Sequence, residues 1–541
     1  MADGSQQGFN FHRTALASAL RKGEIVVDFF AGGGGASEAL RQALGRDPDV
    51  AVNHDHQAIG MHAANHPFTR HMEADVWTVD ILREVAGRLV GWFHASPDCT
   101  HFSQAKGGQP RDRATRSLSW VVLKVAGTLA KQGLAPRIIS LENVRQILGW
   151  CPLVAKRDKA TDRVLKLDGT VAAPGERVPL REQFLVPDKR RHGHTWDRFV
   201  AALRALGYVV EWRTLKACDY GAGTSRERLF LIARRDGQPI VWPEPTHGPG
   251  RAHPYVTAAD CIDWSVPCPS IFTRKKPLAD ATCRRIAKGV HRYVLGAAEP
   301  FIVQCANASA NGSAATSEPL GVVTAWPKGG THAVVAPILA GVGGRAGDTE
   351  PRPANQHAYT VTAKADCALV TAFLEQAHGG GENGNPARAR GAKEPVSTIS
   401  TTGSQQRLVT ADLAALSPEH EAGALRVAAF LINYYGNGQA LDLCDPVDTV
   451  TTRDRLALVT VTIRGTPYVI VDIGLRMLRR EELYRAQGFP PGYIIDRTAA
   501  GEPLSISASV RMVGNSVSPP PLAAIARANL EPASVPEQIA A

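Results

Sequence analysis

The sequence contains no long apolar run. No stretch offers the roughly 18 uninterrupted apolar residues that a membrane-spanning helix needs. A content of 44% hydrophobic and 21% charged residues is typical of a soluble globular protein. The first ten residues are polar and lack the apolar core of a signal peptide. We therefore expect a cytoplasmic protein that has no membrane segment.

Paired cysteines are absent as well. The chain has nine cysteines, an odd number, and no two of them stand in a Cys-x-x-Cys pattern. Disulfide frameworks and structural zinc sites both depend on cysteines at recurring short spacings. We therefore expect reduced thiols and no metal site.

The charge is unbalanced towards the positive side. Lysine and arginine total 61 against 51 acidic residues, a net charge of +10, which favours a polyanionic partner. A surplus of this size in a long chain also occurs in proteins that bind no nucleic acid. Residues 151–195 carry ten basic against six acidic residues, a local surplus of +4. This insertion either contacts phosphates or forms a solvated loop.

The first 235 residues alternate short apolar runs with helical patterns. This alternation is typical of an α/β domain, a parallel sheet with helices on both faces. Helices are expected at 117–132 and 195–206, each ending near a glycine that can cap it. The expected strands are Glu24–Phe30, Val50–Asn53, Gly91–Ala95, Arg137–Leu141, Val209–Ala217 and Arg228–Ala233.

From about residue 236 to 475 the composition changes. Gly, Pro, Thr and Val become more frequent, and a degenerate repeat appears. One repeated element recurs at 300–302, 337–339, 372–374 and 429–431, and the other at 322–324, 360–362, 398–400 and 449–451. The pattern predicts a β-rich module of stacked repeats. A helical pattern returns after 475, and a tail from about Glu531 is expected to be disordered.

A glycine-rich stretch follows the first expected strand. Residues 25–37 read Ile-Val-Val-Asp-Phe-Phe-Ala-Gly-Gly-Gly-Gly-Ala-Ser, a buried strand that leads into a glycine loop and then a helix. Glycines let the backbone approach a ligand at the carboxyl edge of an open α/β sheet. A tight structural turn without a ligand is the alternative interpretation.

Two chemically active side chains are expected at the same sheet edge. Cys99 follows the strand at 91–95, and most lone cysteines are inert packing residues. Here Pro97 fixes the loop and the neighbouring residues are polar, which favours an exposed nucleophile. Glu142 ends the strand at 137–141, although a carboxylate there could also face a helix N-terminus.

In this order, the glycine loop, Pro-x-Cys and Glu-Asn-Val resemble the DNA cytosine-5 methyltransferases. Three later blocks extend the resemblance, at 220–228, 476–490 and 514–520, so that similar blocks run from residue 24 to 520. The resemblance implies a Rossmann-like methyltransferase sheet in residues 1–235, with the insertion at 151–195. It also implies a β-rich target-recognition domain at 236–475 and a segment at 476–541 that returns to the catalytic domain.

The resemblance implies a role for each active-site residue. Cys99 would attack carbon 6 of cytosine as a thiolate, and Glu142 would assist at ring nitrogen 3. Arg226 and Arg228 resemble the family's base-binding and structural arginines, with Arg228 placed at the O2 side of the base. A salt bridge inside the sheet is the alternative for this pair.

The same resemblance implies that S-adenosylmethionine is the methyl donor. Asp75 is placed like the acidic residue near the adenine, although a short Asp could merely cap the next helix. The residues expected to hold the cofactor are Phe30, Gly32, Gly34, Gly35, Asp55, Asp75, Pro97, Asn515 and Val517.

The chain departs from the family pattern at three positions. Asp98 stands between Pro97 and Cys99, where the family usually has Pro-Cys. Asn53 occupies the place of the usual ribose-binding acid, with Asp55 two residues later. Thr224 replaces the Gln of the Gln-x-Arg-x-Arg block.

Double-stranded DNA is the expected partner, and a monomer is the expected state. A base inside a duplex must be flipped out before its carbons 5 and 6 can react. Lys364, Arg407, Arg453 and Arg455 lie beside the repeats and could reach DNA, or could be ordinary solvated residues. An RNA acceptor, a larger transferred group and a binding protein without turnover are the alternatives.

Overall fold

The computed structural model falls into two compact units. Unit 1 comprises residues 1–262, 317–331 and 478–541, and unit 2 comprises residues 263–316 and 332–477. The residues that the structure describes are 18–99, 101–102, 110–263, 265–278, 283, 286, 301–304, 313–320, 332–341, 352–353, 368–376, 389–391, 406–413, 422–424, 426–427, 430, 460–463 and 466–532.

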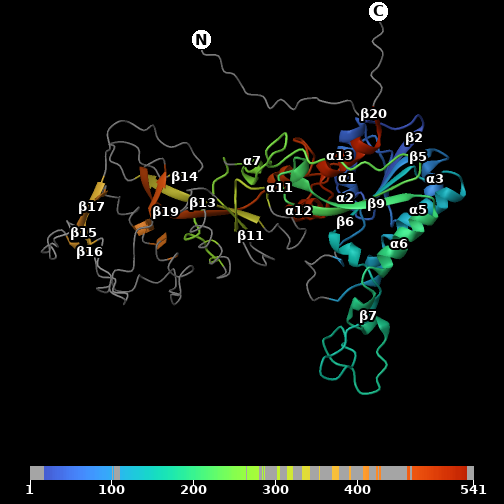
Figure 1. Cartoon of the computed structure of the whole chain (residues 1–541), viewed down its shortest axis with the longest axis horizontal. Helices are drawn as coiled ribbons and strands as arrows, with labels where there is room; N and C mark the ends of the chain where they lie inside the picture. Colours follow the sequence, from blue (N-terminus) through green and yellow to red (C-terminus); the bar gives the residue numbers. More distant parts are fainter. Residues whose placement is uncertain are drawn as a thin grey trace, which may run out of the picture. The chain divides into compact units, whose positions relative to one another are not determined.

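Unit 1 is built on a seven-stranded sheet with the order β4-β3-β2-β5-β6-β10-β9 (Figure 1). Neighbouring strands from β4 to β6 are parallel, whereas β10 is antiparallel to both β6 and β9. The strands are β2 Glu24–Phe29, β3 Val50–Asn53, β4 Arg70–Glu73, β5 Leu89–Ala95, β6 Ile138–Asn143, β9 Val209–Lys216 and β10 Glu227–Arg234.

The expected strands are all present, with two corrections. The sheet is not wholly parallel, because β9 and β10 are joined directly and without the crossover that parallel neighbours need. Strand β4 was not among the expected strands, and it pairs with β3 along its whole length. Its side chains are exposed or half-buried, so the apolar signal of a strand is missing.

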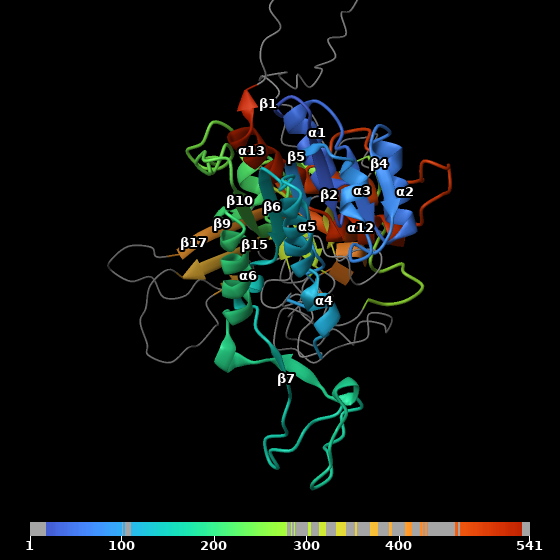
Figure 2. The ribbon, with the colours of Figure 1, turned by 90° about the vertical axis from the view of Figure 1, so that its right-hand side faces the viewer.

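Helices cover both faces of this sheet, as Figure 2 shows for α1 and α13 against α5 and α6. Gly133 and Gly207, with φ of 73° and 88°, follow α5 and α6 as predicted. The helices of unit 1 are α1 Gly35–Leu44, α2 His56–Asn65, α3 Ile81–Val85, α4 Arg113–Ser117, α5 Trp120–Lys131, α6 His194–Ala205, α7 Ala258–Cys261, α11 Arg480–Gln487, α12 Ile506–Asn515 and α13 Pro519–Asn529.

Consecutive apolar residues of the central strands point to opposite faces and fill two separate cores. Val26, Trp92 and Ile138 pack with α1 and α13 in one core. Their successors Val27, Phe93 and Ile139 pack with α5 and α6 in the other. Fully burying one such side chain contributes about 1.5–3 kcal/mol, so continuous apolar strands stabilise a sheet covered on both sides.

The division between the units falls at residue 262, later than the predicted boundary at 235. Residues 241–261 belong to unit 1 because both ends of this segment bond to it. The Val241 amide donates to Asn529 Oδ1 at 2.9 Å, and the Cys261 backbone carbonyl accepts from Arg485. At the other end, β20 Glu531–Pro532 pairs with β1 Ser18–Ala19, so the first two residues of the expected tail are ordered. Residues 533–541 lie outside the described part of the chain.

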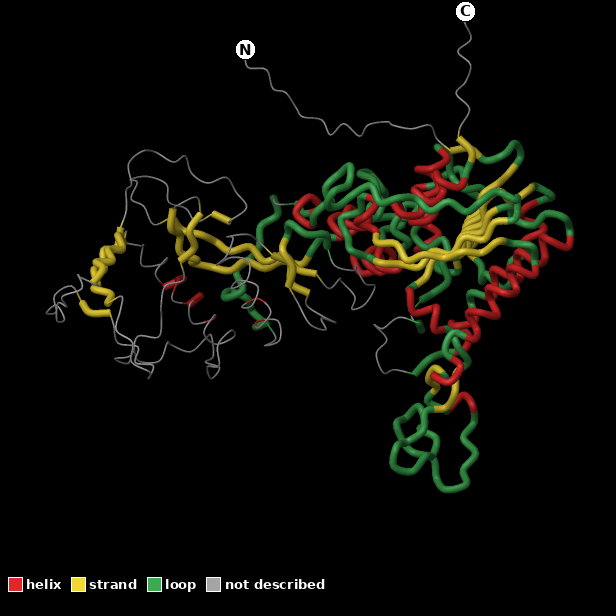
Figure 3. Tube along the Cα trace, viewed as in Figure 1, coloured by secondary structure: helices red, strands yellow, loops and turns green. Residues whose placement is uncertain are grey.

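The described residues of unit 2 form two antiparallel sheets, whose strands are drawn in yellow in Figure 3. Repeat elements at 337–339 and 372–374 lie in strands as expected, whereas Phe430 in the fourth copy is helical. The second element of every repeat lies outside the described residues. The strands are β11 Phe301–Gln304, β12 Ser313–Ala315, β13 His332–Gly341, β14 Arg352–Pro353, β15 Ala368–Gln376, β16 Ala389–Gly391, β17 Gln406–Leu413, β18 Thr460–Ile463 and β19 Thr466–Met477.

None of the described helices combines the length and the apolar character that crossing a bilayer requires.

Candidate active site

The predicted catalytic loops meet at one edge of the sheet. Strands β2, β5 and β6 are parallel neighbours, so their carboxyl ends lie side by side. The glycine loop follows β2, Cys99 follows β5, and Glu142 is the second-to-last residue of β6. Strand β10 is antiparallel, so its first residues, including Arg228, reach the same edge.

Glu142 and Arg228 form a buried ion pair at this edge. Arg228 Nε lies 3.2 Å from Glu142 Oε1, and the residue Glu142 is only 6% exposed. Burial raises the pKa of the Glu142 carboxyl, while the charges of Arg228 and Arg226 oppose that rise. Oε1 accepts no hydrogen bond from any residue in the described ranges, so this buried oxygen can accept from, or protonate, a ligand.

The Cys99 loop is tied to both neighbouring strands. Asn143 donates through Nδ2 to the Pro97 carbonyl at 3.0 Å, and Ser96 Oγ donates to the Phe30 carbonyl at 3.3 Å. Pro97 is buried, Asp98 is exposed and Cys99 is half-buried. The loop therefore keeps a fixed position although Asp98 separates Pro97 from Cys99.

The Cys99 sulfur lies within the electrostatic reach of the other predicted catalytic groups. Burial raises the pKa of the Cys99 thiol. The positive charges of Arg228 and Arg226 lower it, and the negative charges of Glu142 and Asp98 raise it. The structure therefore brings the predicted nucleophile, acid and arginines into one cluster.

Arg226 and Arg228 have different surroundings. Arg226 is 2% exposed and donates through Nη1 to the Gly514 carbonyl at 3.0 Å, which joins β10 to the end of α12. Its amide donates to Thr224 Oγ1 at 3.3 Å, so the residue that replaces the family Gln supports this turn. Burial and the neighbouring charge of Arg228 lower the pKa of Arg226. Arg226 contacts the scaffold, and Arg228 contacts the acid.

The glycine loop has two kinds of glycine. A Cβ on Gly34, whose φ is 99°, would collide with the Tyr493 hydroxyl, and one on Gly35 would collide with Ser516 Oγ and the Val517 carbonyl. These two positions need glycine because protein packs against them. A Cβ on Gly32 would have only the Phe30 carbonyl, at 3.8 Å, within 4 Å. Gly32 therefore faces the open side of the loop.

The loop backbone fits the methionine end of S-adenosylmethionine, the cofactor that the resemblance implies. Phe30 has a φ of 61°, which costs a non-glycine residue about 1–3 kcal/mol and is typical of functional sites. Helix α1 begins behind the loop with Gly34 as N-cap and without a side-chain cap. A carboxylate is stabilised by such uncapped amides. Val517 is 3% exposed beside this loop, and Asn515 is exposed at the end of α12.

The two predicted cofactor acids both have protein partners. Asp55 caps α2 by accepting from the Ala58 amide at 3.0 Å and pairs with Arg511 Nη1 at 2.7 Å. Asn53 supports it, because its Oδ1 accepts from the Asp55 amide at 2.8 Å. Asp75 accepts from the Trp77 amide at 2.9 Å. Both acids follow strands that end at the catalytic edge, and their contact with a cofactor stays a prediction.

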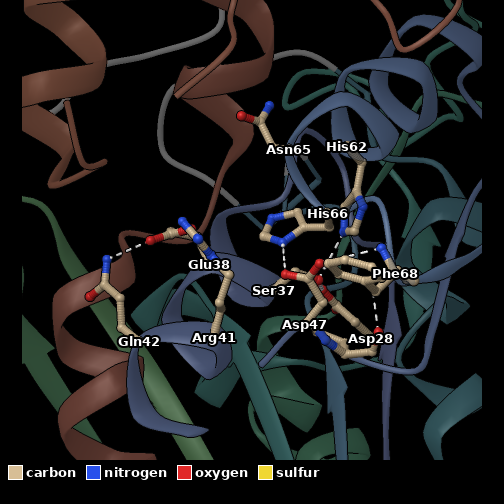
Figure 4. A network of polar contacts seen from close by, with 12 residues as sticks. Asp28, Ser37, Glu38, Arg41, Gln42, Asp47, His62, Asn65, His66 and Phe68 are labelled. Carbon is tan, nitrogen blue, oxygen red and sulfur yellow. Dashed lines mark hydrogen bonds and ion pairs between the residues drawn. The ribbon is translucent and has the colours of Figure 1, made fainter. Parts of the chain in front are cut away.

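A buried polar chain that the sequence analysis did not identify lies behind the loop (Figure 4). Ser37 Oγ donates to Asp28 Oδ2 at 2.7 Å and lies 2.8 Å from His62 Nε2. His62 Nδ1 is 2.8 Å from His71 Nε2. Burial raises the pKa of Asp28 to about 7 and lowers the pKa values of His62 and His71. The chain joins β2, α1, α2 and β4.

A second set of contacts holds the loop itself. The Tyr493 hydroxyl donates to the Gly33 carbonyl at 2.7 Å and lies 3.3 Å from His66 Nε2. His66 Nδ1 in turn lies 3.0 Å from Asp47 Oδ1, a contact drawn in Figure 4. The signal for Tyr493 was its position at the end of the Gly-Phe-Pro-Pro-Gly turn at 488–492.

Most of the suggested DNA contacts of the repeat region fall outside the described residues. Lys364, Arg453 and Arg455 belong to this group, and Arg407 is described only as part of strand β17. Among the residues with described positions, no three His, Cys, Asp or Glu side chains are arranged to hold a metal ion.

Comparisons with known proteins agree on one family. A family model described as C-5 cytosine-specific DNA methylase matches residues 25–151 and 187–261, so the match omits residues 152–186. The type II methyltransferase M.AgeI of Thalassovita gelatinovora is 29% identical over 231 residues, 42% of this chain and 43% of the relative. M.AquIA of Picosynechococcus sp. is 25% identical over 253 residues, 44% of this chain and 87% of that one.

A comparison with solved structures covers more of the chain. The Dnmt2 methyltransferase of S. pombe aligns with a TM-score of 0.40 at 13% identity, over 92% of this chain and 96% of that one.

Proposed function

The chain belongs to the family of C-5 cytosine-specific DNA methylases, and from this premise we propose that it transfers a methyl group from S-adenosylmethionine to carbon 5 of cytosine in double-stranded DNA. The matched region spans 43% of M.AgeI, so activity, substrate and cofactor are proposed here from the site.

One arrangement carries the proposal. A half-buried thiol, Cys99, lies within reach of the charges of Glu142 and Arg228, and these two side chains lie 3.2 Å apart. Cytosine needs a nucleophile at carbon 6 and an acid at nitrogen 3 at the same time, because its ring does not otherwise react at carbon 5. A thiol next to a buried carboxylic acid supports this double requirement.

The proposed reaction begins when Cys99 loses its proton to solvent water. The thiolate adds to carbon 6 and breaks the π bond between carbons 5 and 6, while Glu142 donates its proton or a hydrogen bond to nitrogen 3. Carbon 5 then takes the methyl group, and the electron pair of the broken sulfur–methyl bond stays with the donor sulfur. Afterwards water removes the proton of carbon 5, the double bond between carbons 5 and 6 re-forms as the bond between carbon 6 and Cys99 breaks, and Glu142 recovers its proton.

The raised pKa of Glu142 suits this role, because the acid is then more often protonated near neutral pH. Arg228 has the complementary task of stabilising the Cys99 thiolate and binding the O2 side of the base. Arg226 holds the end of α12 and thereby keeps Arg228 in position.

When bound, S-adenosylmethionine supplies a sulfonium-activated methyl group. Phe30, Gly32 and the uncapped start of α1 would hold its methionine end, with Asn515 and Val517 beside it. Asp55 and Asp75 would hold its ribose and adenine. Pro97 lines the same edge and carries the carbonyl that Asn143 fixes.

Covalent trapping tests the proposal. We expect the full chain, given S-adenosylmethionine and a duplex containing 5-fluorocytosine, to form a protein–DNA adduct, because fluorine at carbon 5 blocks the final elimination. Cys99→Ala should form no adduct. Cys268→Ala removes another half-buried cysteine and should trap normally.

The acceptor is tested in the same experiment. DNA and RNA duplexes of one sequence are offered side by side, and methylation of RNA alone would refute the assignment of DNA. Bisulfite sequencing of DNA from cells that express the chain would then identify the methylated site. No adduct and no methylation with either acceptor would refute the enzyme.

A further inference from the structure

The insertion between β6 and α6 forms a projecting arm. We define the arm as residues 151–193; it leaves the sheet after the short helix η2, Arg145–Gly149, and ends where α6 begins. Figures 1 and 2 show it extending away from the sheet of unit 1. Because β6 ends with Glu142 and Asn143, the arm starts at the catalytic edge. The family resemblance omits most of it, so the shared chemistry does not explain its presence.

The arm has its own internal framework. Strand β7, Leu153–Ala155, pairs with β8, Leu185–Pro187, and bridges beyond them continue the pairing. Its base is bound to the segment after the Cys99 loop, since Arg111 donates its amide to the Leu185 carbonyl at 2.9 Å and Arg116 donates to the Cys151 carbonyl at 3.2 Å. The arm is therefore positioned relative to the catalytic edge.

The acidic side chains of the arm are engaged within it. Asp158 accepts from the amides of Ala160 and Thr161, and Asp168 accepts from Thr170. Other acids bond inside the arm as well: Asp188 accepts from the Arg190 amide, and Glu176 pairs with Lys166 at 2.5 Å. The carboxylates thus face the turns of the arm.

Five of the ten basic side chains of the arm face water instead. Lys159, Arg177, Lys189, Arg190 and Arg191 are all exposed, and none forms an ion pair with a residue in the described ranges. Lys189–Arg191 form one short 3-10 turn at the base of the arm. His192 follows this turn directly, and a Cβ on Gly149 would collide with the His192 ring. The turn therefore lies against η2, the short helix that follows Glu142.

We propose that the arm binds the phosphates of duplex DNA that flank the target cytosine, with Lys189, Arg190 and Arg191 as the main contacts. This inference rests on the proposed function, because that function brings a duplex to the catalytic edge from which the arm projects. Exposed cations without acidic partners bind phosphates by releasing condensed counterions. The arm would add affinity without reading sequence, since phosphate contacts carry no base information.

A charge-matched pair of variants tests the arm. The first is K189Q/R190Q/R191Q. The control K22Q/R83Q/K131Q removes three exposed cations that also form no ion pair with described residues, but that lie on elements near the opposite edge of the sheet. Binding of the full chain to a fluorescent duplex is measured by anisotropy over a range of salt concentrations. A third variant, K159Q/R177Q, tests the outer part of the arm.

We expect the slope of log K against log [salt] to fall by about 2–3 in the first variant, because each phosphate contact contributes about 0.9. The control should keep the slope of the unmodified chain. If the slope falls equally in both triple variants, the effect comes from net charge alone and the proposal is overturned. A slope that is unchanged in all three variants would also overturn it. Thermal unfolding of each variant separates lost contacts from lost folding.

The outcome is separable from that of the proposed function. Trapping on 5-fluorocytosine depends on Cys99, whereas the salt slope needs no turnover. If trapping fails but the slope falls selectively in the arm variant, the arm binds DNA and the enzyme assignment is wrong. If trapping succeeds and the slopes are equal, the enzyme stands and the arm proposal falls. A protein partner would instead use the exposed apolar side chains Leu167 and Leu180, which L167S/L180S would disrupt without changing the slope.

Discussion

Arg228 Nε lies 3.2 Å from Glu142 Oε1, and both side chains act on the Cys99 thiol with opposite sign. Arg228 lowers the pKa of Cys99 and Glu142 raises it. The same arginine lowers the pKa of Glu142 against the effect of burial. This ion pair therefore influences the pKa values of both the nucleophile and the acid. Substituting Glu142 and Arg228 one at a time tests the two effects separately.

Glu142→Gln should separate thiol reactivity from methyl transfer. The substitution removes a negative charge near Cys99, so the pKa of the thiol falls and alkylation by iodoacetamide at pH 7 becomes faster. Methylation should drop by about 10²–10⁴-fold, because an amide cannot protonate nitrogen 3. Labelling of Cys99→Ala is subtracted as background from the other cysteines. Slower alkylation of the Gln variant would show that Glu142 does not act on the sulfur.

Arg228→Gln should change thiol reactivity in the opposite direction. Loss of the positive charge raises the pKa values of both Cys99 and Glu142, so alkylation at pH 7 slows and methylation falls. The melting temperature should change little beside that of Arg226→Gln, which loses the bond to the Gly514 carbonyl in a buried setting. Alkylation rates and thermal unfolding of the two variants are compared. Equal destabilisation by both substitutions would contradict the division of roles.

Tyr493→Phe should weaken cofactor binding more than it weakens the fold. It removes the hydroxyl that donates to the Gly33 carbonyl, and a net loss of about 1–1.5 kcal/mol corresponds to a roughly tenfold weaker affinity. Tyr208→Phe is the matched control, because its buried hydroxyl donates to the Pro136 carbonyl at 2.7 Å, at the edge of the sheet opposite the loop. Calorimetric titration with S-adenosylmethionine measures both, and equal affinities in the two variants would rule out a positioning role for Tyr493.

Asp28→Asn should make stability less dependent on pH. Burial raises the pKa of Asp28 from 3.8 to about 7, so the folded protein holds a proton there that the unfolded chain has released. The unfolding free energy therefore falls as pH rises from about 4 to 7, by an amount on the order of 4 kcal/mol. His62 and His71 oppose this trend below pH 6.5, because their lowered pKa values keep them neutral when folded.

The comparison of variant with unmodified chain isolates Asp28. The difference in melting temperature, Asn variant minus unmodified chain, should be more favourable at pH 8 than at pH 5. Asp162→Asn removes one exposed carboxylate and should show a smaller dependence. A difference that is constant across this range would mean that Asp28 is ionised throughout.

Asp55 can be tested against its structural partner. Asp55→Asn keeps a side chain that caps α2 but loses the ion pair with Arg511, and Arg511→Gln loses the same ion pair from the other side. If Asp55 contacts the ribose, the Asn variant should bind S-adenosylmethionine several-fold more weakly than the Gln variant at similar melting temperatures. If the two variants bind S-adenosylmethionine with the same affinity, Asp55 has only a structural role, as the cap of α2 and the partner of Arg511.

Local patterns were sufficient for most elements of unit 1. The central strands are continuous apolar runs, and such runs form where both faces are covered, as they are for Val26 and Val27. Strand β4 escaped prediction because its stabilisation comes from the ladder with β3, and its side chains stay largely in water. The hydrophobic pattern of a sequence does not reveal a strand that is stabilised mainly by backbone hydrogen bonds.

The residues of the candidate site were found by type and order, whereas their partners were not. Sequence alone placed Cys99, Glu142 and the glycine loop after strands that end at one edge, because parallel neighbours share that edge. It left open whether Arg226 or Arg228 meets the acid. It also did not identify Tyr493, which lies 460 residues from the Gly33 carbonyl that it holds.

By itself the sequence determined the apolar strands at the centre of the unit 1 sheet and which reactive groups stand at their ends, since these depend on neighbours a few residues apart. Only the tertiary structure decided that Arg228 faces Glu142, that Tyr493 and Val517 pack on the glycine loop, and that the basic arm starts beside the catalytic edge. Such contacts depend on strand order and on the chain's return after unit 2, and neither leaves a local trace in the residues.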